Sequence, residues 1–179
     1  MLVKEKTAFV LIDVQGKLAE IVYESEKMIK NLKTLIEALK ILEIPIIWLE
    51  QYPEGLGKTT PDIAELLTGY APIRKMTFDA CKNEQFMKAL RATGKTQMLV
   101  AGIEAHICVW QTACGLKKLG YHVEVAKNAI SSRRLEDKEI GLEKMRSAGI
   151  IITGVETAIY ELLEAAGTEQ FKKILRLVK

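Results

Sequence analysis

Three side chains that lie far apart in the sequence could together form a nucleophilic site: Cys108, Asp13 and Lys75. Cys108 follows an apolar run, residues 99–101, and a turn at Gly102, where a buried strand should give way to a helix. Backbone N–H groups at a helix start favour negative charge, so the sequence predicts that the Cys108 pKa lies below the usual ~8.5 of a thiol. A thiol, a carboxylate base and a cation together suit nucleophilic catalysis.

Each of these residues also has a purely structural explanation. Asp13 ends the first apolar run, and an aspartate there often only caps a helix. A cysteine at a helix start is usually buried packing. Lys75 belongs to a short run, residues 72–76. The residue types alone therefore leave a catalytic and a structural interpretation equally open.

The elements that would position these residues alternate between strand and helix. Continuous Val, Ile and Leu runs separated by helices predict an α/β fold, with a mostly parallel six-stranded sheet flanked by helices in one three-layer domain, residues 1–179. The strand carboxyl ends should share one edge, bringing Asp13, the Gly102 turn and the loop at Tyr52 together. Thr153 and Glu156 have capping-box spacing for a later helix. The predicted strands are 7–13, 46–49, 73–76, 96–101, 123–126 and 150–152, and the helices include 25–42, 83–91, 106–119, 135–148 and 171–178.

Composition excludes several classes of protein. The net charge is +3, from 26 basic and 23 acidic residues, which is too balanced to predict a nucleic-acid or membrane surface. Three cysteines without a Cys-x-x-Cys pair favour a reducing compartment. The first residues do not form a signal peptide, so we expect a cytoplasmic protein.

Several segments resemble one family in order and spacing over nearly the whole chain. The segments around Asp13 (Leu-Ile-Asp-Val-Gln) and Cys108 (Ala-Gly-Ile-Glu-Ala-His-Ile-Cys-Val), together with Lys75, resemble the isochorismatase-like cysteine hydrolases. The Ser-Ser-Arg segment at 131–133 and the loop at 50–57 are most similar to the isochorismatase domain-containing subgroup.

The resemblance implies a hydrolase of a small amide, imide or carbamoyl compound. Cys108 would attack the carbonyl to give a thioester, Asp13 would be the general base, and Lys75 would hold their charges together. It also implies a cis peptide at Ile103–Glu104, which would aim the backbone N–H groups of Glu104 and Cys108 into an oxyanion hole. The candidate pocket residues are Gln15, Tyr52, Phe78 and Ile107.

The chain also departs from two branches of this family. Nicotinamidases of the family bind a metal through an Asp and histidines after the second strand, whereas this chain has only His106 and His122, neither of them there. We therefore expect no metal and no cofactor. Isochorismatases proper lack the cysteine and cleave a vinyl ether, a chemistry against which Cys108 argues.

The remaining histidine and cysteine residues are expected to be structural. Residues two apart on a helix point roughly 200° apart, so His106 should face away from the Cys108 thiol. Cys114, six positions further on, lies about 9 Å along a helix and cannot bridge to Cys108. Cys81 is expected to pack, and His122 to lie at the surface.

The chain is also expected to form a homo-oligomer, a dimer or an assembly of dimers. The predicted helix after Cys108 carries Trp110, Cys114 and Leu116 beyond the residues that should touch the sheet, which suggests an interface. Members of the family that the chain resembles commonly assemble in this way.

Three other functions compete with hydrolysis. A non-catalytic interaction or regulatory protein could retain the fold. A phosphoacceptor receiver domain needs acidic residues beside its Asp, but Glu5 is distant and Val14 and Gln15 are not acidic. An Asp-x-Asp phosphatase fails because Gln15 stands in place of the second Asp.

Overall fold

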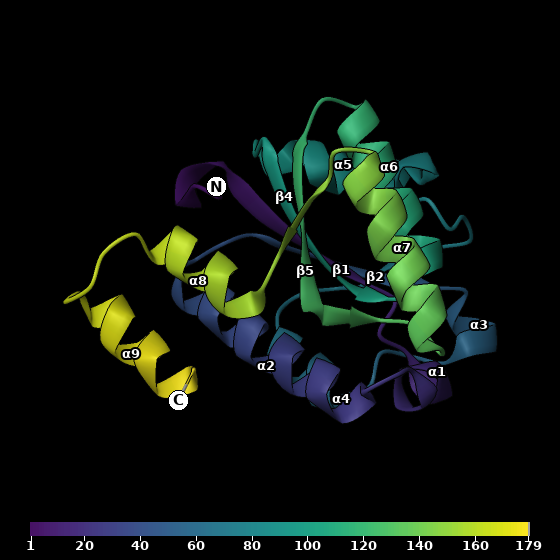
Figure 1. Cartoon of the computed structure of the whole chain (residues 1–179), viewed down its shortest axis with the longest axis horizontal. Coiled ribbons are helices and arrows are strands. Elements are labelled where there is room, and N and C mark those ends of the chain that lie inside the picture. Colours follow the sequence, from purple (N-terminus) through teal and green to yellow (C-terminus); the bar gives the residue numbers. More distant parts are fainter. Residues whose placement is uncertain (179) are drawn as a thin grey trace.

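A six-stranded parallel sheet runs through the computed structural model, which describes residues 1–178 (Figure 1). The strand order is β3-β2-β1-β4-β5-β6, and every neighbouring pair is parallel. This confirms the predicted α/β fold class. The strands are β1 (Thr7–Ile12), β2 (Ile46–Gln51), β3 (Ile73–Lys75), β4 (Gln97–Ile103), β5 (His122–Ser131) and β6 (Ile151–Thr153).

Helices cover both faces of this sheet. Helices α2 and α8 lie on one face and α5, α6 and α7 on the other, while α9 packs against α2 (Figure 1). Among residues 1–178, no helix is long and apolar enough to span a membrane. The α-helices are α1 (Gly16–Ile21), α2 (Ser25–Ile41), α3 (Pro53–Leu56), α4 (Pro61–Ala64), α5 (Glu84–Ala92), α6 (Trp110–Lys118), α7 (Leu135–Ser147), α8 (Val155–Leu163) and α9 (Glu169–Leu177).

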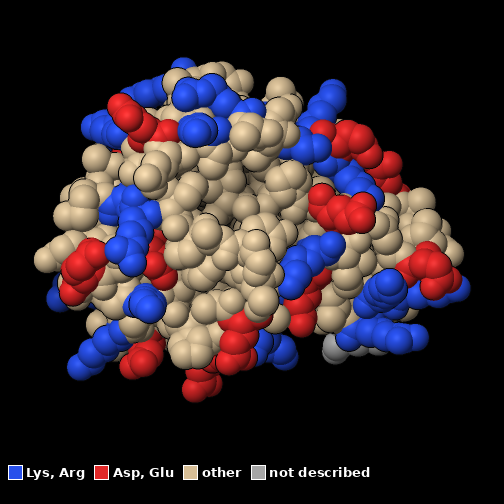
Figure 2. Space-filling model, turned by 180° about the vertical axis from the view of Figure 1, so that it is seen from behind, with Lys and Arg blue, Asp and Glu red and all other residues tan. Residues whose placement is uncertain are grey.

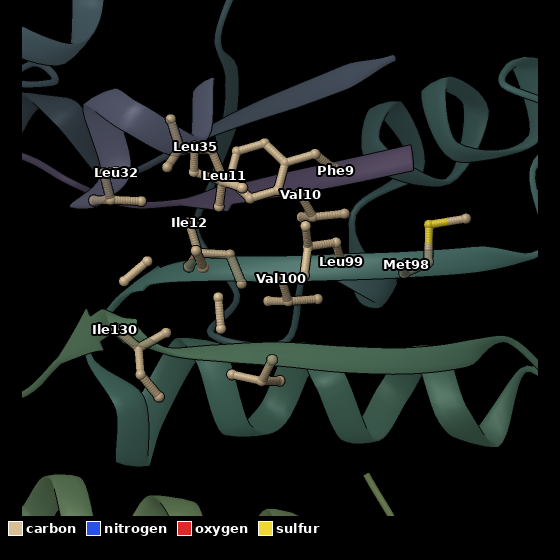
Figure 3. Packing of buried hydrophobic residues seen from close by; sticks show 14 of the residues in the cluster. Phe9, Val10, Leu11, Ile12, Leu32, Leu35, Met98, Leu99, Val100 and Ile130 are labelled. Atoms are coloured by element: carbon tan, nitrogen blue, oxygen red, sulfur yellow. The ribbon is translucent and has the colours of Figure 1, made fainter. Parts of the chain in front are cut away.

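The two central strands are buried on both faces. Every residue of β1 is buried, and Figure 3 shows Phe9 and Leu11 of this strand beside Leu35 of α2. Burying one such side chain stabilises the fold by roughly 1.5–3 kcal/mol. A strand covered by helices on both faces must be apolar at successive positions, which explains the continuous apolar runs in the sequence.

From β1 the chain first adds β2 and β3 on one side and then β4, β5 and β6 on the other, so the strand order reverses between β1 and β4. The carboxyl ends of these two parallel strands lie side by side at this switch point. Gly102, near the end of β4, has φ +123°, and a Cβ there would overlap the carbonyl oxygen of Ile12. The two strands therefore meet too closely for any side chain at this position. Ligand sites of doubly wound sheets lie at this kind of crevice.

Two local expectations differ from the structure. The predicted helix at 106–119 begins as a π-helical turn, Ala105–Val109, and only then continues as α6. The capping box does not form, because Gly154 is the N-cap of α8 and the Thr153 hydroxyl has no partner among residues 1–178. The Val155 N–H instead donates to Asn128 Oδ1 at 2.9 Å, so a side chain from β5 caps this helix.

Strand β5 is longer and less regular than expected. Val100 of β4 pairs with Val125, but Gly102 pairs with Ile130, so the register moves two residues along β4 and five along β5. This bulge contains Lys127 and Asn128, both exposed or partly exposed polar residues. Those polar residues broke the apolar pattern from which the strand was predicted to end at 126.

The outer surface carries both signs of charge. Figure 2 shows Lys and Arg interspersed with Asp and Glu on the face opposite to the view of Figure 1, around an area without charged side chains. On this face, neither sign forms a continuous patch.

Candidate active site

Asp13, Lys75 and Cys108 meet at the carboxyl edge of the sheet. Asp13 follows β1 with φ 53°, a left-handed conformation that is uncommon outside glycine. Lys75 ends β3, and Cys108 lies in the π-helical turn after β4. All three are nearly inaccessible, at 2%, 2% and 6% exposure. Lys75 Nζ lies 2.7 Å from Asp13 Oδ2, in a buried ion pair.

Lys75 reaches Asp13 across an intervening strand. β3 is the edge strand, and β2 separates it from β1, so the two backbones are roughly 10 Å apart, two strand spacings, and the Lys75 and Asp13 side chains together bridge that distance. Gln51, paired with Lys75 in the sheet, accepts from Lys75 Nζ through Oε1 at 2.7 Å. The Thr77 carbonyl is a third, weaker acceptor at 3.4 Å. The ammonium is therefore held from three directions.

Sequence analysis missed Gln51. Its side chain lies between Lys75 and Cys108, whose Sγ is 4.0 Å from Gln51 Oε1, and its Nε2 donates to the Met76 carbonyl at 2.8 Å. The second strand was expected to end at Leu49, which put Gln51 in a loop. A polar residue at the carboxyl end of a buried strand was the available signal, since Asp13 holds the same position on β1.

The expectation of a low Cys108 pKa was wrong. Burial raises the pKa of the Cys108 thiol, the Asp13 carboxylate raises it further, and Lys75 only partly opposes both effects. Burial likewise raises the Asp13 pKa, although Lys75 acts in the other direction. At neutral pH the resting site therefore holds a Cys108 thiol rather than a free thiolate.

Two neighbouring elements fix the turn that carries Cys108. The peptide bond Ile103–Glu104 is cis, and Glu104 Oε1 accepts from the backbone N and Nε of Arg133, both at 3.0 Å. On the other side, Gly141 of α7 faces the backbone of Ala105, where an added Cβ would lie 2.8 Å from the carbonyl carbon and oxygen. The turn therefore has little room to move.

The candidate pocket residues fall into two groups. Gln15 is fully buried; its Nε2 donates to the carbonyls of Gln51 and Gly57, and its Oε1 accepts from Gln51 N. Its polar atoms are thus engaged in bracing the end of β2. Tyr52 and Phe78 are about half exposed, at 46% and 53%, and Ile107 is partly buried, so these three have the accessible surface that Gln15 lacks.

The two histidines contact other side chains, and the two remaining cysteines form no disulfide in the part of the chain that the structure describes. His106 Nδ1 lies 2.9 Å from Ser132 Oγ, and His122 Nε2 lies 2.8 Å from Glu124 Oε1. Cys81 and Cys114 are free thiols. Burial, and to a smaller extent the Asp79 carboxylate, raises the pKa of Cys81 to about 12. Within residues 1–178, no group of three or more His, Cys, Asp or Glu side chains could hold a metal ion.

The premise used to predict an interface on α6 was partly wrong. Leu116 is completely buried in the core, so it cannot belong to an exposed stripe. Trp110 is partly buried and packs against the core, with Lys144 Nζ 5.1 Å from its ring centre. Most of the apolar surface that was expected to form an interface on α6 is thus covered by other parts of the same chain.

Comparison with known proteins agrees with this fold. Residues 7–157 match the isochorismatase domain. Isochorismatase domain-containing protein 2 of Danio rerio is 31% identical over 173 residues, covering 96% of this chain and 86% of the relative. A structure described as MAR1 ribonuclease from Caenorhabditis elegans is 34% identical, with a TM-score of 0.92, covering 99% of this chain and 91% of that one. The Escherichia coli YcaC protein, described as an octameric hydrolase of unknown specificity, shares the fold at 24% identity and a TM-score of 0.92, covering 98% and 89%. The chain belongs to the isochorismatase family.

Proposed function

We propose that this protein hydrolyses a small amide, imide or carbamoyl compound through a thioester on Cys108. The observation that carries the proposal is a difference in hydrogen bonding between the two carboxylate oxygens of Asp13. Oδ2 is bound by Lys75 at 2.7 Å, whereas Oδ1 is buried and has no hydrogen-bond partner among residues 1–178. A buried carboxylate oxygen without a donor is ready to accept a proton, and the Cys108 thiol is its close neighbour.

The raised pKa values suit a concerted first step. Asp13 takes the thiol proton as sulfur bonds to the carbonyl carbon, and the C=O electron pair moves to oxygen. Collapse of the adduct breaks the C–N bond, and the leaving nitrogen receives the proton from Asp13. Asp13 then deprotonates a water molecule that attacks the thioester, and the C–S bond breaks as Cys108 regains a proton.

The charge that develops on the carbonyl oxygen needs donors in the turn. We assign this role to the backbone N–H groups of Glu104 and Cys108. The Glu104 carbonyl accepts from Ile107 N and Val109 N, which flank the Cys108 amide and hold the turn in shape. One such donor contributes roughly 3–4 kcal/mol to lowering the barrier.

The burial of Cys108 favours a small substrate. Cys108 is only 6% exposed, whereas the candidate pocket residues Tyr52 and Phe78 are far more accessible. A homo-oligomer is also part of the proposal. Tyr52, Met76 and Phe78 follow the paired ends of β2 and β3 and expose 46%, 68% and 53% of their surfaces, which a second copy could cover. Three free cysteines support a cytoplasmic, reducing location.

The test is a screen of small amides, imides and carbamoyl compounds for ammonia release, with Cys108→Ala as the control. Intact mass spectrometry of a quenched reaction should show the acyl group added to the wild type and absent from Cys108→Ala. Single-stranded RNA belongs in the same screen because a similar structure is described as a ribonuclease. RNA cleavage that depends on Cys108, with no acyl adduct from any C–N substrate, would replace the proposed reaction.

A further inference from the structure

We propose that a second cavity, separate from the Cys108 site, binds a small tetrahedral oxyanion: phosphate, or the phosphate monoester end of a small metabolite. The cavity has a volume of about 280 Å³ and lies between α2, the β5 bulge and α7. Asp13, Lys75 and Cys108 are not among the residues that line this cavity. Its polar lining is Glu24, Lys27, Asn31, Lys127, Asn128 and Lys138.

Lys138 is the central feature of this cavity. It is nine-tenths buried, at 9% exposure, yet within residues 1–178 its ammonium has neither an ion-pair partner nor a side-chain hydrogen-bond acceptor. Lys75, the other buried lysine, has three acceptors. The stem of Lys138 is buried, while its ammonium nitrogen is not among the fully enclosed atoms that lack a partner. The ammonium therefore keeps hydrogen-bonding capacity that the fold does not use and that a ligand in the cavity would satisfy.

The surrounding charges make the missing partner an anion. Burial lowers the pKa of Lys138; Glu24 opposes that shift, and Lys127 and Lys27 add to it. Lys27 is already paired with Glu24 at 3.4 Å. The cavity therefore combines three lysines with one carboxylate, an excess of two positive charges.

The neighbouring cavity provides an internal comparison. It shares Lys127 and Lys138 with the first and adds Arg146, but its lining also includes Glu24, Glu139 and Glu143. Three basic groups there face three acidic ones. Only the smaller of the two cavities has a positively charged lining, so an anion should bind there, on the β5 side of Lys138.

The β5 bulge supplies oriented amide groups. Asn128 Oδ1 accepts from Val155 N at 2.9 Å, which leaves the amide NH₂ of Asn128 as the group free to donate. Asn31 Nδ2 donates to the Asn128 carbonyl at 2.7 Å, which fixes the second amide beside it. Bulges often re-aim side chains near functional sites. Lysine ammonium groups and amide N–H donors together suit a tetrahedral oxyanion.

Isothermal titration calorimetry with inorganic phosphate, at constant ionic strength set by chloride, tests the site. We expect the wild type to bind and Lys138→Met to bind at least tenfold more weakly. Lys144→Met, which removes an exposed lysine of the same helix, should bind like the wild type. Without phosphate, Lys138→Met should unfold at a higher urea concentration than the wild type, because burial disfavours the charge that this variant removes.

Two further arms complete the test. Glycerol phosphate that binds more tightly than phosphate would assign the site to a metabolite monoester, and equal or weaker binding to the inorganic ion. If Lys138→Met does not fold, Lys127→Ser, at an exposed position, should weaken phosphate binding several-fold. The proposal is overturned if the wild type binds neither compound, or if the lysine variants bind phosphate as the wild type does.

Discussion

Gln51 Oε1 accepts a hydrogen bond from Lys75 Nζ at 2.7 Å, as short as the ion pair between Lys75 and Asp13. Gln51→Leu should therefore leave the ammonium free to shift away from Cys108. A hydrogen bond to a charged group contributes about 1.5–3 kcal/mol, so kcat should fall 10- to 100-fold. Gln85→Leu, at an exposed glutamine on α5, is the matched control and should retain full activity. Equal rates in the two variants would show that Gln51 is only structural.

Removing Lys75 should lower both stability and activity, and a second substitution at Asp13 should restore stability without restoring activity. Lys75→Met leaves the Asp13 carboxylate buried without its partner, and the free energy of unfolding should fall by about 3–5 kcal/mol. Adding Asp13→Asn removes that stranded charge, so the double variant should recover much of the stability while staying inactive. Urea unfolding followed by circular dichroism measures the first effect and ammonia release the second. If the double variant is as unstable as Lys75→Met, the ion pair does not set the cost.

The pKa of Cys108 predicts opposite effects of its two neighbours on alkylation. Since burial and Asp13 raise this pKa, iodoacetamide should label Cys108 slowly at pH 7 and faster as the pH rises above ~8.5. Asp13→Asn should speed the labelling, because it removes a negative charge that disfavours the thiolate. Lys75→Met should slow it, because it removes the opposing positive charge.

Peptide mass mapping over a pH series follows this labelling, with Cys81 as an internal reference whose pKa depends on Asp79 instead. Asp13→Asn should also lower turnover by 10²- to 10⁴-fold while it raises reactivity towards iodoacetamide. Slower labelling in Asp13→Asn would contradict the electrostatic assignment.

Gly141 should limit both stability and activity, although it lies on α7 and carries no functional group. A methyl group there would meet the Ala105 backbone at 2.8 Å, so Gly141→Ala must push the Cys108 turn or the helix aside. We expect a loss of about 1–3 kcal/mol in unfolding free energy and a larger fractional loss in kcat than in binding. Gly154→Ala is the control, because a Cβ there meets atoms at an ordinary 3.6 Å or more.

Sequence analysis predicted the framework better than the electrostatics. The apolar runs of β1, β2 and β4 are long because helices cover both faces, so pattern alone located them. The π-helical turn was not predictable, since apolar spacing does not distinguish it from the first turn of an α-helix. The Cys108 pKa was misjudged because the burial of its turn depends on packing against α7 and β4, which no local pattern contains.

Two details of the structure, one in the candidate site and one outside it, depended on contacts between distant segments. Gln51 acquires its role only when β2 lies between β1 and β3, and Asn128 caps α8 only because the β5 register shifts. In both cases the residue type was visible in the sequence, but its partner was not. The position of Asp13 at the end of β1 was predicted because a polar residue ending a buried strand needs no partner to be noticed.

The three-residue strand β3 has a consequence for how this protein loses function. Lys75 is its last residue, and β3 pairs with β2 alone, so the ammonium depends on the outermost rung of the sheet. Edge segments with few hydrogen bonds open locally at free energies well below that of global unfolding. Mild heat or dilute urea should therefore switch the site off while the central strands are still folded, and reclosing of β3 should restore it without refolding of the chain.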